Sequence, residues 1–184
     1  MGDDSGRDLH LPARADPVAA AVVLHPHPAM GGDRHHPLVV ALAAGLAEAG
    51  VAALRPDLTD PSFPAGAEAL AAIALDLRAE VGVDRLFLVG YSWGSVVTAL
   101  AAVDDVAARV LVAPPVTHVE LAPRSEPTLV LVPAHDQYGP PDAARAAFAP
   151  WPDATVEVVD GCDHFVAGAI GRITERSVAW LVDT

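Results

Sequence analysis

Residues 86–94 read Leu-Phe-Leu-Val-Gly-Tyr-Ser-Trp-Gly, an apolar run that leads into a Gly-x-Ser-x-Gly pentapeptide. Small residues with a helical pattern follow directly. The order of strand, pentapeptide and helix places Ser92 on a tight turn that pushes its hydroxyl outward. Neighbouring segments approach such a turn too closely for side chains at Gly90 and Gly94. Ser92 is therefore the first candidate for a nucleophile, and the alternative is a glycine-rich turn with an incidental serine.

Apolar runs alternate with helical patterns along the rest of the chain. The predicted strands span residues 18–24, 51–54, 85–89, 109–112, 128–132 and 155–159, and the predicted helices span 37–50, 67–80, 95–103, 141–148 and 167–182. This alternation predicts an α/β fold with a doubly wound, mostly parallel sheet and helices on both faces. Pro61, Pro64 and Gly66 predict an irregular segment ahead of the second helix.

Length, composition and charge narrow the class of protein. The 184 residues are 52% hydrophobic and 19% charged, which suits one domain with a large core. We expect residues 1–17 to form a polar N-terminal lead-in, with a short edge strand near residues 9–11, and residues 18–184 to form a single domain. The formal net charge of −13 argues against nucleic acid or an anionic membrane as a partner, because both require clustered Lys and Arg.

The absence of a recognisable signal peptide and the single cysteine favour a cytoplasmic location. Residues 1–8 lack the basic and then apolar pattern of a signal peptide. Every apolar run is shorter than the roughly 18 residues needed to span a bilayer. Cys162 is the sole cysteine, so an intramolecular disulfide is excluded. The sequence leaves the oligomeric state open.

Candidate partners for Ser92 lie on loops after later strands. A serine hydroxyl needs a base, and the base needs an orienting carboxylate. His164 follows the last predicted strand, and Asp136 follows the strand before it. The chain order serine, aspartate, histidine is the order expected for a nucleophile on this kind of turn. The rival acids are Asp105, Asp160 and Asp163, and the last of these is adjacent to the histidine and therefore poorly placed to orient it.

The oxyanion of an acyl-transfer reaction needs two hydrogen-bond donors. One is the backbone N–H of the residue after the nucleophile, which is Trp93. The other is expected in the loop after the first long strand, where Pro26 and Pro28 have no N–H. His27, between the two prolines, is the favoured donor, and Met30 is the alternative.

The same early loop is rich in histidine. His25, His27, His35 and His36, together with Asp33, match no standard ligand spacing for a metal. We therefore expect neither a metal nor another cofactor. His25 is expected to be a buried, hydrogen-bonded anchor of the loop. Cys162 is expected to be a partly buried thiol rather than a nucleophile, because no tight turn presents it.

Taken together, these residues resemble the α/β-hydrolase superfamily from about residue 18 to the C-terminus. They are similar in particular to its small bacterial branch without a lid, whose early loop reads His-Pro-His-Pro followed by Gly-Gly. The matching segments are residues 25–28, 31–32, 54–57, 90–94, 112–115 and 163–165. The resemblance implies a nucleophile at Ser92, a base at His164, an acid at Asp136 and oxyanion donors at His27 and Trp93.

Two departures from the family pattern bear on the substrate pocket. Residues 58–64 are proline-rich and look shortened, and residues 114–127 are too few for the helical lid that many relatives insert. We therefore expect an open site. Its expected lining residues are Met30, Tyr91, Tyr138 and Phe165, together with Trp93.

The leading functional hypothesis is a serine hydrolase of the carboxylesterase or thioesterase type, which cleaves a small-molecule ester or thioester through an acyl-enzyme. A second hypothesis is an acyltransferase or an elimination enzyme that uses the same three residues on a specialised metabolite. An open site argues against the exclusion of water that acyl transfer requires. A third is a non-catalytic binding module, which is disfavoured because the fold alone does not require these residues. The sequence names neither the substrate nor its acyl-chain length.

Overall fold

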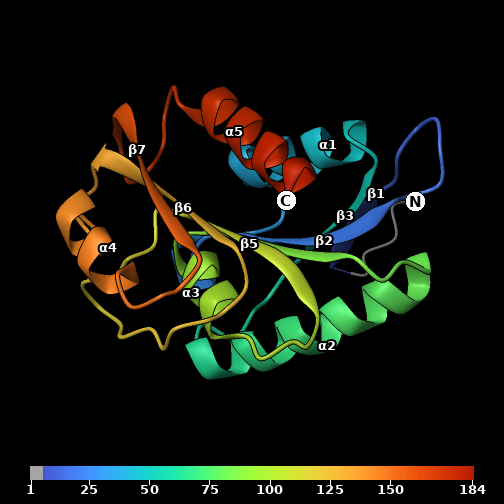
Figure 1. The fold of residues 1–184 in the computed structure, drawn as a ribbon, viewed down its shortest axis with the longest axis horizontal. Helices are drawn as coiled ribbons and strands as arrows, with labels where there is room; N and C mark the ends of the chain where they lie inside the picture. Colours follow the sequence, from blue (N-terminus) through green and yellow to red (C-terminus); the bar gives the residue numbers. More distant parts are fainter. Residues whose placement is uncertain (1–5) are drawn as a thin grey trace.

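The computed structural model describes residues 6–184, so the first five residues of the predicted lead-in lie outside the described residues. One sheet has the strand order β1-β3-β2-β4-β5-β6-β7 (Figure 1). Its strands are β1 (Arg7–His10), β2 (Ala19–Leu24), β3 (Val51–Pro56), β4 (Leu86–Tyr91), β5 (Val106–Val112), β6 (Thr128–His135) and β7 (Ala154–Asp163). Only β1, among these strands, runs antiparallel to its neighbour. The predicted α/β fold with a mostly parallel sheet is confirmed.

Helices cover both faces of this sheet. They are α1 (Pro37–Glu48), α2 (Phe63–Val81), α3 (Trp93–Leu100), α4 (Pro141–Phe148) and α5 (Ile170–Asp183), with a short 3-10 turn η1 (Pro28–Met30). Helices α1 and α5 pack on one face, and α2, α3 and α4 pack on the other (Figure 1). Strands β2 and β4 are buried along their whole length, so their sequences are continuous apolar runs rather than alternating ones.

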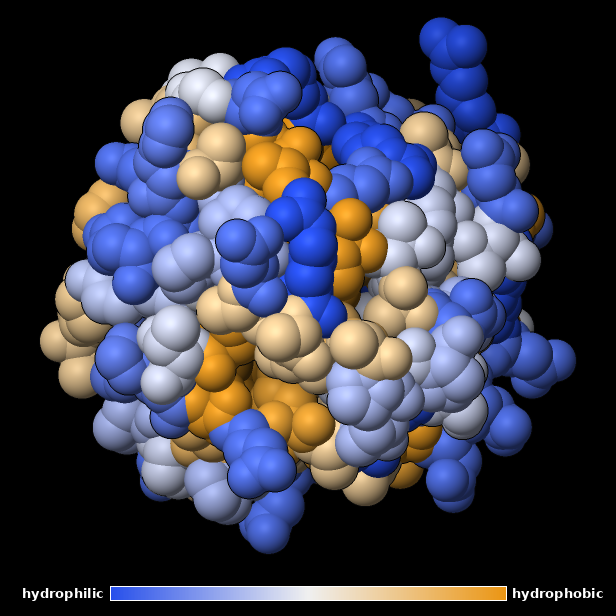
Figure 2. Space-filling view, turned by 60° about the vertical axis from the view of Figure 1, so that its left-hand side comes forward, coloured by the Kyte–Doolittle hydropathy of each residue, from blue (hydrophilic) through white to orange (hydrophobic). Residues whose placement is uncertain are grey.

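The surface contrasts with this core. On the face drawn in Figure 2, hydrophilic residues separate the apolar residues into several small patches. Within residues 6–184, no helix has both the length and the apolar character that crossing a bilayer requires.

The start of α2 differs from the prediction. The prolines and Gly66 suggested an irregular chain up to residue 67, but the helix begins at Phe63. The Ser62 side chain accepts a hydrogen bond from the N–H of Ala65 at 3.4 Å, and Pro64 lies in the first turn, where its missing N–H costs nothing. A Cβ on Gly66 would lie 3.0 Å from the Trp93 ring and 2.9 Å from Val97. The glycine is therefore a contact point between helices rather than a helix breaker.

Other boundaries shift by a few residues. Helix α3 begins at Trp93 rather than at residue 95, because the tight turn runs directly into the helix. Strand β7 was expected to end at residue 159 but continues to Asp163, which pairs with His135 of β6. This extension carries the chain to the position of His164. The short edge strand expected near residues 9–11 is β1, at Arg7–His10.

Candidate active site

Ser92 occupies a strained turn between β4 and α3. Its φ is 53°, a left-handed conformation that side-chain-bearing residues rarely adopt. A Cβ on Gly90 would lie 2.2 Å from the Gly94 carbonyl oxygen, and a Cβ on Gly94 would lie 2.5 Å from the His25 carbonyl oxygen. The two glycines are required by close backbone contacts, as the sequence predicts.

The residues predicted from three separate loops form one hydrogen-bonded chain. Ser92 Oγ lies 2.8 Å from His164 Nε2, and His164 Nδ1 lies 2.9 Å and 3.0 Å from the two carboxylate oxygens of Asp136. Asp136 is buried, and its Oδ1 also accepts hydrogen bonds from the N–H groups of Tyr138 (2.8 Å) and Gly139 (3.1 Å). Because the Nδ1–H of His164 donates to the Asp136 carboxylate, the Nε2 lone pair faces the serine hydroxyl. This tautomer leaves His164 able to accept a proton from Ser92.

The rival acid Asp163 is engaged elsewhere. Its carboxylate accepts a hydrogen bond from the N–H of Phe165 at 3.1 Å and turns the chain after β7. The carboxylate that contacts the His164 ring is therefore that of Asp136 and not that of the adjacent Asp163.

His25 anchors the early loop, as predicted. Its side chain is buried, and its Nε2 accepts a hydrogen bond from the N–H of Leu58 at 2.9 Å. Its Nδ1 lies 2.6 Å from the Pro26 carbonyl oxygen, to which it donates. The ring also stacks on Trp93, with centroids 5.8 Å apart. The early loop is thus fixed against both the segment after β3 and the turn that carries Ser92.

The two candidates for the second oxyanion donor differ in their backbone contacts. The N–H of Met30 donates to the His27 carbonyl oxygen at 3.0 Å, so it is already used. Within residues 6–184, the N–H of His27 has no acceptor. The N–H of Trp93 also lacks an acceptor in its own helix, because Trp93 is the first residue of α3. Both His27 and Trp93 line the cavity described next.

A cavity of about 350 Å³ opens over Ser92. All five predicted lining residues belong to it: Met30, Tyr91, Trp93, Tyr138 and Phe165. Met30 and Phe165 are 77% and 59% exposed and stand at the mouth of the cavity. Sequence reasoning did not identify His36, Phe63, Pro115 and His118, which also line it. These four lie on segments that become neighbours only in the folded chain, so no local signal marks them.

Tyr91 lies beneath the site rather than in its mouth. It is 2% exposed, and its hydroxyl donates a hydrogen bond to the main-chain oxygen of His164 at 2.9 Å. Burial, assisted by the negative charge of Asp136, raises the pKa of Tyr91. The hydroxyl therefore stays protonated and remains a donor.

Comparison with known proteins places the chain in a family. A family model described as alpha/beta hydrolase matches residues 37–128, half of the chain. The chain belongs to the alpha/beta hydrolase family. No curated protein matches it at a significant level.

Solved structures share the fold of this alpha/beta hydrolase at low sequence identity. An alpha-beta serine hydrolase homologue from Coxiella burnetii superposes with a TM-score of 0.85 at 24% identity, over 95% of this chain and 90% of the other. A serine hydrolase without lid from Xanthomonas campestris gives 0.84 at 22% identity, over 96% and 87%. The esterase domain of a Rhodothermus marinus protein gives 0.75 at 20% identity, over 95% and 91%.

The segment between β5 and β6 of this alpha/beta hydrolase contains no lid. Residues 113–127 form no helix, and the Thr117 hydroxyl ties the segment to the Tyr138 carbonyl oxygen at 2.6 Å. The segment therefore borders the cavity without covering it. This agrees with the expected resemblance to the lid-less branch of the family.

The histidines of the early loop do not converge. His36 Nδ1 accepts a hydrogen bond from the N–H of Leu38 at 3.3 Å and caps α1, and burial lowers the pKa of His36. Within the part of the chain that the structure describes, no group of three or more His, Cys, Asp and Glu side chains is arranged to hold a metal ion.

Proposed function

We propose that this alpha/beta hydrolase is a serine hydrolase that cleaves a carboxylic ester or thioester through an acyl-enzyme on Ser92. The observation that carries the proposal is the hydrogen-bonded chain from Ser92 Oγ through His164 to Asp136. A surface serine and histidine would not need a buried carboxylate on the far ring nitrogen, whereas nucleophilic catalysis does. The Rhodothermus marinus neighbour is itself described as an esterase domain.

The first half of the reaction forms the acyl-enzyme. Ser92 Oγ attacks the carbonyl carbon while His164 Nε2 takes its proton. The Asp136 carboxylate stabilises the resulting imidazolium and keeps its orientation, held by two backbone N–H groups. His164 then gives the proton to the departing alcohol or thiol as its bond to the carbonyl carbon breaks. Water, activated by the same histidine, releases the carboxylic acid.

Backbone N–H groups would stabilise the oxyanion. We assign this role to Trp93 and His27, because the alternative donor at Met30 is bonded to the His27 carbonyl oxygen. The N-terminal end of α3 adds the positive end of its dipole at the same place. Removing one such donor typically lowers kcat by about 10²- to 10³-fold.

The open cavity favours hydrolysis over acyl transfer. Acyl transfer profits from excluding water, but within residues 6–184 no lid covers Ser92, and the mouth residues Met30 and Phe165 are largely exposed. A product profile measured with and without added alcohol or amine acceptors separates the activities. We expect the free acid as the main product in both cases, and ester or amide as the main product would instead indicate a transferase.

Labelling with a fluorophosphonate tests the proposed nucleophile. Wild-type protein should be labelled, Ser92→Ala should not, and His164→Ala should be labelled far more slowly. Ser125→Ala is the matched control, because this exposed serine lies outside the cavity. Failure to label folded wild-type protein would overturn the proposal. Hydrolysis of p-nitrophenyl esters with short, medium and long acyl chains then measures how long an acyl group the cavity accepts.

A further inference from the structure

We propose that the cavity over Ser92 selects uncharged esters that carry a planar aromatic ring and discriminates against anionic thioesters such as those of coenzyme A. This inference rests on the proposed function and specifies its substrate class. Two observations carry it. Aromatic and imidazole rings line the cavity, and Asp, Glu, Lys and Arg are absent from the lining.

One wall of the cavity is a continuous row of rings. His118, Tyr138, His164 and Phe165 follow one another, with centroid distances of 6.0 Å, 4.6 Å and 5.9 Å. They come from the segments after β5, β6 and β7, which the parallel sheet brings to one edge. The Tyr138 ring meets the His164 ring edge-on, at 68°. The wall therefore presents ring surfaces right beside the Ser92 hydroxyl.

A second group of rings borders the early loop. Trp93 lies between His27 at 6.1 Å and Phe63 at 6.4 Å, measured between centroids. The Trp93 indole N–H donates to the Pro61 carbonyl oxygen at 2.9 Å, which fixes the orientation of the ring. This hydrogen bond also holds the start of α2, and with it Phe63, against the site.

Fixed rings favour a flat aromatic ligand over an aliphatic one. Aromatic pairs gain from offset-stacked and edge-on contacts at centroid distances of about 4.5 to 7 Å, beyond the apolar area that they bury. The Trp93 and His164 rings, which hydrogen bonds already hold in place, lose little conformational freedom when a ligand binds. The volume of about 350 Å³ is near the lower end for ligand cavities, which suits a single ring on a short linker.

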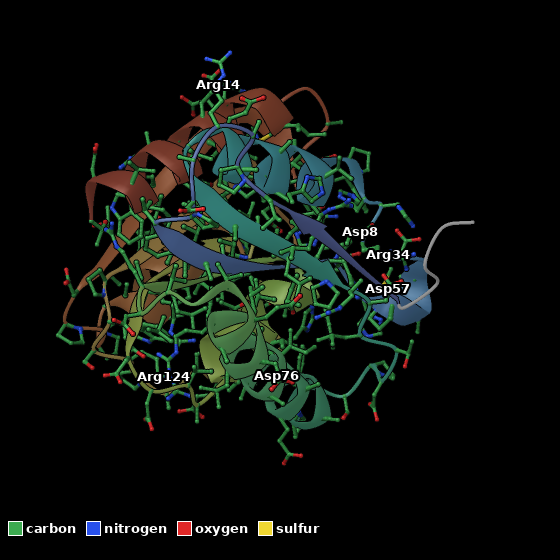
Figure 3. The ribbon with its side chains drawn as sticks, turned by 90° about the vertical axis from the view of Figure 1, so that its right-hand side faces the viewer. Asp8, Arg14, Arg34, Asp57, Asp76 and Arg124 are labelled. Carbon is green, nitrogen blue, oxygen red and sulfur yellow. The ribbon has the colours of Figure 1, made fainter. Side chains whose placement is uncertain are left out.

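The lining carries no permanently charged side chain that could pair with an anion. None of the cavity residues, all within the described part of the chain, is Asp, Glu, Lys or Arg. The cation that follows the early loop, Arg34, is already paired with Asp8 at 3.1 Å and with Asp57 (Figure 3). An anionic substrate would have to leave water without a Lys or Arg side chain beside it, and it would approach a chain with a net charge of −13.

Matched esters test the preference for a ring. Methyl phenylacetate and methyl cyclohexylacetate are similar in size and in carbonyl reactivity, because a methylene separates the ring from the carbonyl, and they differ in whether the ring is planar and aromatic. We expect the aromatic ester to have a kcat/KM about tenfold higher, as two or three ring contacts would supply. Benzyl acetate and cyclohexylmethyl acetate repeat the test with the ring on the alcohol. Equal values in both pairs would overturn the preference for a ring.

A second set of substrates tests charge. Methyl (4-carbamoylphenyl)acetate should be cleaved at least about tenfold faster than methyl (4-carboxyphenyl)acetate, whose free benzoic acid group is anionic at pH 7.5. Phenylacetyl-N-acetylcysteamine should likewise be preferred over phenylacetyl-coenzyme A, which carries the same thioester on an anionic carrier. Equal or faster cleavage of the anionic members would overturn the discrimination against charge.

A variant locates the preference in the ring wall. Tyr138→Leu keeps apolar volume and removes a ring, and its backbone N–H to Asp136 remains. The ratio of kcat/KM for methyl phenylacetate over methyl cyclohexylacetate should fall by about threefold or more, whatever happens to the absolute rates. Trp180→Leu removes a ring on α5 outside the cavity and should leave the ratio unchanged. An unchanged ratio in Tyr138→Leu would refute the role of this wall.

The proposed function and the substrate class fail in different ways. Without fluorophosphonate labelling of Ser92 the serine hydrolase itself is refuted. Labelling of Ser92 together with equal cleavage of aromatic, aliphatic and anionic esters refutes only the substrate class.

Discussion

The two ends of α3 are completed in opposite ways. A helix leaves its first N–H groups and its last carbonyl groups without partners of its own. At the C-terminal end of α3, the chain supplies partners for the carbonyl oxygens of Thr98, Ala99, Leu100 and Ala101, all from the side chains of Arg109 and Arg124. At the N-terminal end, the N–H of Trp93 has no acceptor in its own helix, and we propose that it binds the oxyanion beside Ser92. We therefore expect the C-terminal end of the helix to stabilise the fold and the N-terminal end to serve the proposed reaction.

The positive charge that Arg109 brings to the C-terminal end of α3 is balanced by Glu126. Arg109 is fully buried, and its guanidinium lies 3.0 Å from a carboxylate oxygen of Glu126. Breaking such a pair on one side is costly, because it leaves a buried charge and unpaired carbonyl groups. Substitutions near the N-terminal end should therefore change the reaction rate, whereas substitutions at the C-terminal end should change the stability of the fold.

The largest effect is expected from Asp136→Asn. Asp136 acts at the N-terminal end of α3 through His164, which contacts Ser92. The amide cannot hold His164 in the tautomer that accepts the Ser92 proton, so kcat should fall by about 10³- to 10⁴-fold, with the midpoint of urea unfolding nearly unchanged. Steady-state kinetics on a p-nitrophenyl ester measure the first quantity. Asp163→Asn is the control and should keep kcat within about twofold. A larger loss in Asp163→Asn than in Asp136→Asn would reverse the assignment of the acid.

The next effect is expected at the C-terminal end, from Arg109→Met. The free energy of unfolding should fall by about 3 kcal/mol, because the variant leaves carbonyl groups and Glu126 without their partner. In urea titration the double variant Arg109→Met with Glu126→Leu should recover part of the loss. The kcat of the folded fraction should stay within about twofold of wild type. Full stability with a collapsed kcat would contradict the separation of roles between the two ends.

A smaller effect is expected from Tyr91→Phe, again at the N-terminal end. The variant removes the hydrogen bond to the main-chain oxygen of His164, which fixes the base relative to Ser92. We expect kcat to fall by about fivefold with little change in KM, since one neutral hydrogen bond is involved. Tyr138→Phe loses a hydroxyl in the same cavity and should keep kcat. Equal losses in the two variants would indicate a general effect of phenol removal rather than positioning.

The smallest effect is a pH dependence of the C-terminal end. Burial alone would raise the pKa of Glu126, but hydrogen bonds from its backbone N–H and from Arg109 outweigh burial and lower the pKa. A lowered folded-state pKa gives stability that is complete above the unfolded value of about 4.3 and is lost as the pH falls through the folded value. Glu126→Gln should therefore be less stable than wild type by about 1 kcal/mol at pH 7, with the difference vanishing in acid.

Urea titrations between pH 3 and 7 measure this difference. Glu120→Gln, an exposed residue on the same segment, should match wild type at every pH. A difference for Glu126→Gln that grows toward acid pH would have the wrong sign for the pairing with Arg109.

Much of the site could be predicted because its signals are local. Ser92, Asp136 and His164 each follow an apolar strand, and the carboxyl ends of parallel strands meet at one edge of a sheet. The glycines around Ser92 are explained by the turn itself. The buried role of His25 followed from the rigid loop that it occupies.

The parts that sequence could not predict depend on contacts between distant segments. Gly66 looked like a helix breaker until the packing of α2 on Trp93 showed why a side chain has no room there. Arg109 and Arg124 carry no capping pattern, because they reach the end of α3 from a neighbouring strand and from a loop. His118 and Phe63 line the cavity only because their segments meet over Ser92.

Cys162 is a native probe of motion in the segment at the end of β7, which leads to His164. This sole cysteine lies on β7 just before His164, is 5% exposed, and its thiol donates to the Val159 carbonyl oxygen at 3.4 Å. Because the side chain is buried, a thiol reagent reaches it when the segment opens, and burial also raises the pKa of the thiol. The rate of modification, followed with increasing reagent, would report how often the chain opens around Cys162, two residues before His164. The protein thus carries its own single-site probe of opening at the end of β7, with no label to introduce.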